Sequence, residues 1–412
     1  MPGAGLTSEA FLTIDLPTYM KITNKYTVEA IVFCSYVLFA MAWVGGTVSM
    51  SQIMAAMDLH SLADASFISG AVTFAKIVGT FVAAWLAIKL GVKIAFFVSC
   101  LLVVTGLLTP IAPNYELLLL SRFLMGLGGA LMIVYFNPIV MTWFDTDERP
   151  TINGLNAVAF NVGTAIVLWS MNGINQLTGN WQNSLLCFSV ASLLLAGLWL
   201  LIPAQSTALA TAAQTTSTVQ QSYGYKEGLK DPFNWAYALT YAGLLAFYIC
   251  LFTFYPKAGI SASKWVIGAG IIGTIAGMLY SRKIKQRLPV IRYSGIIQIA
   301  MVIGLSFSPS PLLQTLCAIV LGFFVFFPIT ALVSLPHELP DMTPSRVTVV
   351  FSLFWSISYL FATVILWLFG KLVDMAGGDF TLAFILISAV STTFFIGSFF
   401  LPETQPKQAP QP

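Results

Sequence analysis

Long apolar segments follow one another along almost the whole chain. Stretches such as 27–49, 117–143 and 347–368 reach the length of roughly 20 residues that a helix needs to cross the hydrocarbon core of a bilayer. Only 8% of the 412 residues are charged, whereas soluble proteins carry charge on about a quarter of theirs. In hydrocarbon every backbone N–H and C=O needs a partner inside its own segment. The sequence therefore predicts an all-α membrane protein with many spanning helices.

Twelve spanning segments are predicted, and the charge of their loops sets the expected orientation. The segments are 28–52, 66–88, 94–112, 116–142, 151–172, 183–203, 233–255, 265–281, 293–309, 311–335, 347–370 and 380–401. Basic residues gather in the loops on the side of the two termini, while the other loops hold only Lys257, Lys264 and Lys371. Because cytoplasmic loops are the ones rich in Lys and Arg, both termini are expected in the cytoplasm. The basic cluster at 282–292 is interpreted as lipid-facing rather than as a nucleic-acid contact.

The sequence contains no recognisable metal, cofactor or catalytic pattern. The five cysteines lie inside apolar segments without metal-ligand spacing, and His60 and His337 fall in loops on opposite sides. Buried, inert thiols are the simplest interpretation. Neither a phosphate-binding loop nor a nucleophile elbow is present in the chain. We therefore predict no metal, no cofactor and no enzymatic activity.

A polar, low-complexity stretch divides the chain into two halves. Its composition, rich in Ala, Thr, Ser and Gln, is typical of a flexible linker. The predicted organisation is a leader at 1–27, a six-helix bundle at 28–203, the linker at 204–232, a second six-helix bundle at 233–401 and a tail at 402–412.

The two halves repeat each other. Lys89 and Arg282 follow the second and eighth segments in short basic turns, and Glu148 and Glu338 follow the fourth and tenth. The sequence Gly-Ile-Asn-Gln-Leu at 173–177 is echoed by Gly-Lys-Leu-Val-Asp at 370–374. A nearly constant offset between such pairs indicates an internal repeat, which is common in secondary transporters.

A motif in the fourth segment points to a family. Arg122-Phe-Leu-Met-Gly126-Leu-Gly128 matches Arg-x-x-x-Gly-x-Gly of the major facilitator superfamily, which the chain resembles over almost its whole length. The resemblance implies two pseudo-symmetric six-helix bundles that rock about a central site. The family's turn after the second helix is only partly matched, because Lys89 and Gly91 fit but Ile88 replaces an aspartate. In the family that aspartate helps to latch one conformation, so here the conformational equilibrium is expected to be set elsewhere.

Two full charges are predicted to lie well inside the membrane. Lys76 is 12 residues from the inner end of the second segment, which places it about 18 Å deep. A lysine near the bilayer centre costs about 2.5–3.5 kcal/mol, so we expect it to face the bundle interior as a substrate or coupling group. The alternative is a cation satisfied by helix-end carbonyls or packed polar groups. For Arg122 contact with a substrate and a structural tie between helices both stay open.

Polar and aromatic side chains complete the predicted site. Besides Lys76 and Arg122, the substrate-binding or coupling candidates are Tyr36, Trp43, Asn137, Asn161, Tyr241, Trp355 and Tyr359, with Tyr135, Asn156 and Tyr248 on the same helices. The gating or packing candidates are Gly126, Gly128, Lys89, Gly91, Gly277 and Arg282. For single aromatic residues an interfacial belt or helix packing is the alternative, and for the asparagines interhelical hydrogen bonding.

A buried cation without a carboxylate at the same depth favours a small anionic or zwitterionic organic solute, of carboxylate or amino-acid type. We predict a secondary active or facilitative transporter that works by alternating access, with the proton as a candidate coupling ion. The alternatives are an exporter of hydrophobic compounds and a non-transporting receptor on the same fold. The protein is expected to be a monomer in a bacterial inner (plasma) membrane, in contact with lipids.

Overall fold

The computed structural model describes residues 22–145, 147–203, 223–340, 342 and 344–403, and these form helices and connecting turns without a strand. The first half of the chain forms α1 (Lys25–Val48), α2 (Met50–Ala56), α3 (Leu62–Val104), the 3-10 helix η3 (Thr105–Ile111), α4 (Tyr115–Trp143), α5 (Arg149–Thr178) and α6 (Trp181–Leu200). The second half forms α8 (Tyr225–Lys230), α9 (Pro232–Phe254), α10 (Ser263–Ser281), α11 (Leu288–Phe307), α12 (Pro311–Phe326), α13 (Ile329–Glu338), α14 (Pro344–Met375), α15 (Thr381–Ser391) and α16 (Thr393–Gly397).

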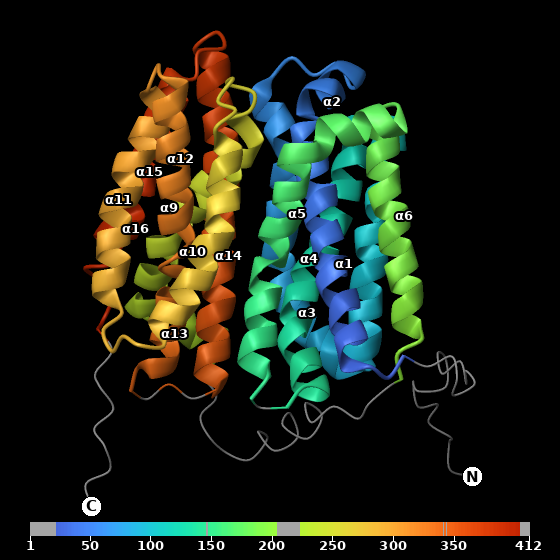
Figure 1. Ribbon diagram of the computed structural model, residues 1–412, viewed down its shortest axis with the longest axis vertical. Helices are drawn as coiled ribbons and strands as arrows, with labels where there is room; N and C mark the ends of the chain where they lie inside the picture. The colour runs from blue at the N-terminus through green and yellow to red at the C-terminus, as the bar shows by residue number, and fades with distance from the viewer. Residues whose placement is uncertain (1–21, 146, 204–222, 341, 343, 404–412) are drawn as a thin grey trace, which may run out of the picture.

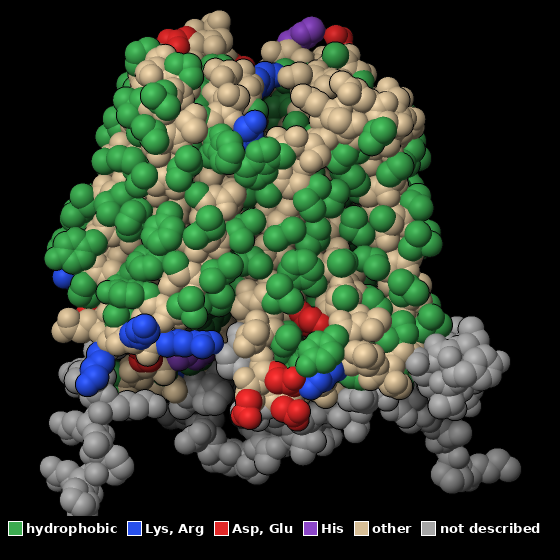
Figure 2. Space-filling model, viewed as in Figure 1, with side chains coloured by type: hydrophobic (Ala, Val, Ile, Leu, Met, Phe, Trp, Pro, Cys, Tyr) green, Lys and Arg blue, Asp and Glu red, His purple; other side chains and the backbone are tan. Residues whose placement is uncertain are grey.

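The number of crossings agrees with the predicted twelve. Among the described residues, 11 helices are long and apolar enough to span a membrane, and a shorter apolar helix at Thr381–Gly397 supplies the twelfth. Hydrophobic side chains cover the flanks of the molecule, while Lys, Arg, Asp and Glu gather toward its two ends (Figure 2). The prediction of an all-α membrane protein is confirmed.

Two breaks in the helices follow from single residues. Gly91 has φ +75°, and this backbone conformation lets α3 turn between the second and third crossings of the chain. Glycine lacks the Cβ that disfavours this backbone conformation in other residues. The tenth crossing is split where α12 ends at Phe326 and α13 starts after Pro328, because proline offers no backbone N–H to continue the helix.

The helices of the two halves stand side by side (Figure 1). We call the end of the molecule where the described chain begins and ends the terminal face, and the end that carries α2 the opposite face (Figure 1). The predicted leader and tail lie largely outside the described residues, as does the linker from 204 to 222. The last residues of the predicted linker form α8, which packs against α14.

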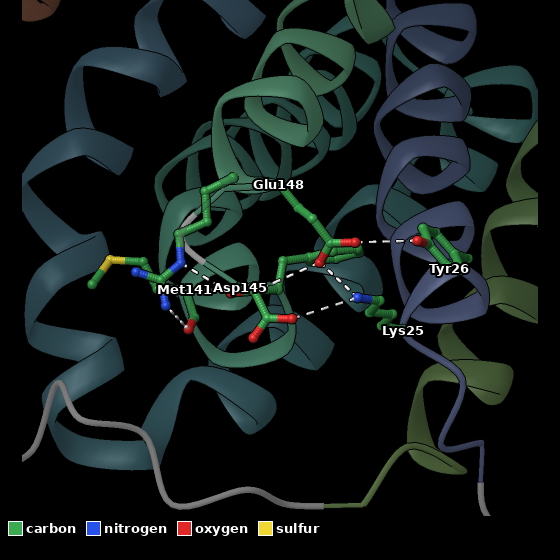
Figure 3. Close-up of polar contacts among 7 residues, drawn as sticks. Lys25, Tyr26, Met141, Asp145 and Glu148 are labelled. Atoms are coloured by element: carbon green, nitrogen blue, oxygen red, sulfur yellow. Dashed lines mark hydrogen bonds and ion pairs between the residues drawn. The ribbon is translucent and has the colours of Figure 1, made fainter.

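Each half carries an ion pair at the terminal face. Glu148 accepts a hydrogen bond of 2.6 Å from Lys25 Nζ and one of 3.2 Å from the Tyr26 hydroxyl (Figure 3). The hydrogen bond from Lys25 holds the pKa of the Glu148 carboxyl below its usual range. In the second half, Arg287 donates to both oxygens of Glu338, at 3.0 and 2.6 Å. The two glutamates that repeat in the sequence therefore both tie the start of one helix to the chain at or just after the end of another.

Candidate solute-binding site

A cavity of about 570 Å³ lies between the two halves. The residues that line it include Tyr36, Trp43, Lys76, Asn137, Asn156, Asn161, Tyr241, Tyr248, Trp355 and Tyr359, all of them sequence-predicted candidates. The cavity reaches toward the terminal face along Asn153 of α5, Met278 of α10 and Ser334 of α13. Its volume falls in the range of about 300–1,000 Å³ typical of small-molecule sites.

Lys76 lies on α3 within the second crossing, and aromatic rings enclose its ammonium group. Its ammonium nitrogen is 5.1–5.9 Å from five ring centroids, those of Tyr36, Phe39, Trp43, Phe160 and Tyr359. It also donates a hydrogen bond of 3.5 Å to the Tyr36 hydroxyl. Four of the rings come from α1 and α5, and Tyr359 comes from α14 in the other half. We refer to these five rings as the aromatic cage.

The aromatic cage changes the energetic argument for this lysine. A desolvated cation over an aromatic face gains about 2 kcal/mol or more, so the site stabilises the ammonium without a counter-ion. Among the described residues no carboxylate forms an ion pair with Lys76. The aromatic cage thus supplies part of the stabilisation of the Lys76 ammonium that would otherwise have to come from a bound anion. The side chain is only 4% exposed, so a solute must rearrange the cage to reach it.

Arg122 lies outside the cavity lining. Its guanidinium donates to three backbone carbonyls, Ile68 at 2.9 Å, Ala42 at 2.9 Å and Trp43 at 2.7 Å. These carbonyls belong to α1 and α3, so the arginine ties α4 to both helices inside the first half. Of the two roles left open by the sequence, the structure favours the structural tie. Gly46 of α1 makes room for it, because a Cβ there would lie 2.5 Å from the Nη1 atom.

The second half contributes an aromatic wall to the cavity. Tyr241 and Trp355 meet edge to face with centroids 5.7 Å apart, and Trp355 stacks on Tyr359 at 5.9 Å. Tyr248 donates a hydrogen bond of 2.8 Å to the amide oxygen of Asn161, which joins α9 to α5 across the cavity. Such a wall binds the apolar body of a solute by area and stacking.

Glu29 is an unexpected buried acid beside this site. Its side chain is only 4% exposed, and neither oxygen has a hydrogen-bond partner among the described residues. It lies two heptads before Trp43 and one before Tyr36 on α1, which puts the three side chains on one helix face. The amide of Asn156 lies beside it without completing a hydrogen bond of good geometry.

The gating or packing candidates separate into two groups. Gly126, Gly128 and Gly277 lie where helices touch, since a Cβ at each would collide with the backbone of a neighbouring helix. Lys89 and Arg282 are exposed in the turns, and Lys89 Nζ lies 4.8 Å from the ring centroid of Trp85. The two turn residues therefore do not contribute to the cavity.

Sequence reasoning missed several lining residues. Phe136, Asn153 and Phe160 line the cavity, and Phe39 completes the aromatic cage. Asn153, Asn156 and Phe160 follow each other at helical spacing on α5, so a search for residues on the same helix face as Asn156 would have found Asn153 and Phe160. Tyr135 lies outside the described cavity lining, where its buried hydroxyl donates a hydrogen bond to the carbonyl of Ala83.

Two bundles of spanning helices around a central cavity define a polytopic membrane transport protein. The family model described as Major Facilitator Superfamily matches residues 32–363, and the chain belongs to this family. A curated relative, Uncharacterized protein Cj0987c of Campylobacter jejuni, is 28% identical over 278 residues, which cover 63% of this chain and 84% of the relative.

Solved transporters share the fold at low sequence identity. The xylose transporter XylE of E. coli in an inward open conformation matches with a TM-score of 0.75 and 13% identity, over 93% of this chain and 98% of that one. The fucose:proton symporter FucP of E. coli matches with a TM-score of 0.62 and 17% identity, over 91% and 98%. At these identities the likeness extends to the fold.

Proposed function

We propose that this transporter carries a small organic anion or zwitterion through the central cavity by alternating access. The observation that carries the proposal is the ammonium of Lys76 in a cavity whose described lining contains no Asp or Glu. An anion entering such a site meets one cation and no carboxylate in the described lining. A carboxylate is the simplest group of this kind.

The lining supports a solute with a charged end and an apolar body. A carboxylate between Lys76 and the Tyr36 hydroxyl accepts from both groups after the aromatic cage opens on that side. The apolar body then lies against Tyr241 and Trp355, while Asn137 and Asn161 offer hydrogen bonds. Charge-assisted hydrogen bonds at one end orient the solute in the cavity. Stacking along the aromatic wall buries the apolar surface of the solute.

A neutral sugar is the second candidate. Aromatic faces interleaved with amides suit the ring and hydroxyl groups of a sugar, and the two solved neighbours described above are a xylose transporter and a fucose:proton symporter. A sugar does not need the ammonium of Lys76, whereas an anion does. The lysine therefore distinguishes the two candidates.

The side of the membrane and the coupling ion form part of the same proposal. We take the terminal face as cytoplasmic because the loops there carry most of the Lys and Arg residues. Glu29 is the candidate for a coupling proton, since it is buried beside the cavity without a partner among the described residues. If it carries the proton, Glu29→Gln transports without pH dependence, while Asp145→Asn at the exposed loop behaves like the wild type.

The test is direct binding by purified protein. Isothermal titration with a panel of monocarboxylates, amino acids, pentoses and hexoses identifies the class. For an anion we expect Lys76→Ala to weaken binding at least about 100-fold, as for other desolvated charge pairs, and Lys76→Arg to recover part of it. Lys226→Ala removes an exposed lysine on α8 and serves as the matched control. Sugar binding that survives Lys76→Ala unchanged would overturn the anion proposal.

A further inference from the structure

Asp374, at the end of α14 in the second half, binds the start of α3 in the first half. Its carboxylate accepts hydrogen bonds from the backbone N–H of Leu62 at 2.8 Å, from that of Ala63 at 2.9 Å and from the Ser61 hydroxyl at 2.9 Å. The first N–H groups of a helix have no partner inside it, and the helix dipole favours a negative charge there. A carboxylate from one half thus caps a helix of the other.

The backbones of the two helices touch one turn away from this carboxylate. A Cβ on Gly370 would lie 2.8 Å from the carbonyl oxygen of Leu62 and 2.9 Å from the Ala63 backbone. Any larger residue at position 370 must push α14 and α3 apart. Both contacts lie at the opposite face, away from the end toward which the cavity extends.

We propose that Asp374 is the latch that holds the opposite face closed in this transporter. Opening the cavity to that face requires the ends of α3 and α14 to separate, and the carboxylate then exchanges three protein donors for water. Charge-assisted hydrogen bonds are about twice as strong as neutral ones, so the latch biases the equilibrium toward the closed arrangement. It lies at the other end of the molecule from the terminal-face turn, where Ile88 is 73% exposed.

The corresponding place in the first half has no such latch. The repeat aligns Gly173 with Gly370 and Leu177 with Asp374. Leu177 is 89% exposed, and a Cβ on Gly173 would meet nothing within 4 Å. The start of α10, which corresponds to that of α3, has no side-chain cap among the described residues. The latch is therefore present at one of two equivalent positions. If the carboxylate served only the fold that the two halves share, we would expect one in each half.

Spin-label distances across the opposite face test the latch in the full chain. Labels on His60→Cys and Met375→Cys, both exposed, report the separation of the two halves in lipid nanodiscs. The background carries Cys34→Ser and Cys187→Ser, because these are the exposed cysteines among the five. We expect a short distance to dominate in the wild type and Asp374→Ala to raise the open-to-closed ratio about tenfold or more.

Matched variants separate a latch from a simple helix cap. Asp379→Ala removes an aspartate of the same face that accepts hydrogen bonds from Phe380 and Thr381 of its own half, and it should leave the distances unchanged. Gly370→Ala should open the face, while Gly173→Ala should not. Asp374→Asn, which keeps the shape and one acceptor, should give an intermediate shift and replaces Asp374→Ala if that variant does not fold. Wild-type distances in Asp374→Asn and Asp374→Ala, with or without lower thermal stability, would overturn the proposal.

Discussion

Two of the seams along which the halves meet differ in chemistry. In the seam between α3 and α14, hydroxyl pairs join the halves at Thr73–Thr363, 2.7 Å apart, and at Thr80–Ser356, 3.2 Å apart, and Asp374 completes the row at the opposite face. In the seam between α5 and α10, Trp169 and Trp265 meet edge to face at 5.6 Å, and the ring of Trp169 covers Gly268. One seam is hydrogen-bonded and the other is apolar.

This difference separates two tasks in a rocking protein. Hydrogen bonds need their donors and acceptors at fixed distances and angles, so the α3–α14 seam holds one register. Apolar contact is non-directional and depends on the area that is covered, so the α5–α10 seam tolerates sliding. We infer that the first seam selects the conformation and the second keeps the halves together while they move.

Locking the polar seam covalently should have the largest effect. Ser61→Cys combined with Asp374→Cys places two thiols on the residues whose hydroxyl and carboxylate oxygens are now 2.9 Å apart. Oxidation should abolish transport because the opposite face can no longer open, and a reductant should restore it. Uptake into proteoliposomes before and after reduction measures this. Full transport by the oxidised double variant would contradict the role of the seam, and each single variant controls for the lost side chain.

Installing the missing carboxylate should have the next largest effect. Leu177→Asp gives the α5–α10 seam the residue that Asp374 provides in the other seam. If the two positions are equivalent, the new carboxylate caps α10 and favours the closed opposite face. The open-to-closed ratio from the spin-label distances should therefore fall several-fold. Leu177→Asn, without the charge, is the control. An unchanged distribution would mean that the repeat does not extend to these helix ends.

Removing one hydroxyl pair should cost less. Thr363→Val keeps the shape but loses the contact with Thr73, and interhelical hydrogen bonds in membrane proteins contribute about 0.6 kcal/mol on average. The open-to-closed ratio should therefore rise about threefold or less, below the shift caused by Asp374→Ala. Thr315→Val, at a half-buried position whose hydroxyl bonds its own helix, is the control. A shift larger than that of Asp374→Ala would place the latch in the middle of the seam.

An ion pair inside one half should have the smallest effect. The pKa of Glu148 is lowered from 4.5 chiefly by the hydrogen bond from Lys25. A carboxyl with a lowered pKa stabilises the fold above its unfolded pKa and loses this contribution as pH falls through the folded value. Glu148→Gln should therefore melt slightly below the wild type at pH 7 and equal to it well below pH 4.5, without a change in spin-label distances. A conformational shift in this variant would show that the terminal-face pair also gates.

Much of the fold was predictable because the constraint is local. Length and apolarity alone decide whether a segment spans a bilayer, so the twelve crossings follow from the sequence. The expected depth of Lys76 comes from counting residues along one helix. Most of the polar and aromatic cavity residues could be predicted because they lie on the helices expected around the central site. The family motif around Arg122 indicated the fold but not the function of the arginine.

The partners of these residues depended on the tertiary structure. Whether Lys76 meets a carboxylate or an aromatic cage, and whether Glu29 is exposed or buried, depends on the rotation of four or more helices about their axes. Asp374 reads in the sequence as a charge at a helix end, and only the approach of α3 turns it into an inter-half cap. The sequence by itself determined the segments and their depths, because the bilayer acts on each helix separately. Tertiary structure decided the contacts, because each of them joins helices that are far apart in the chain.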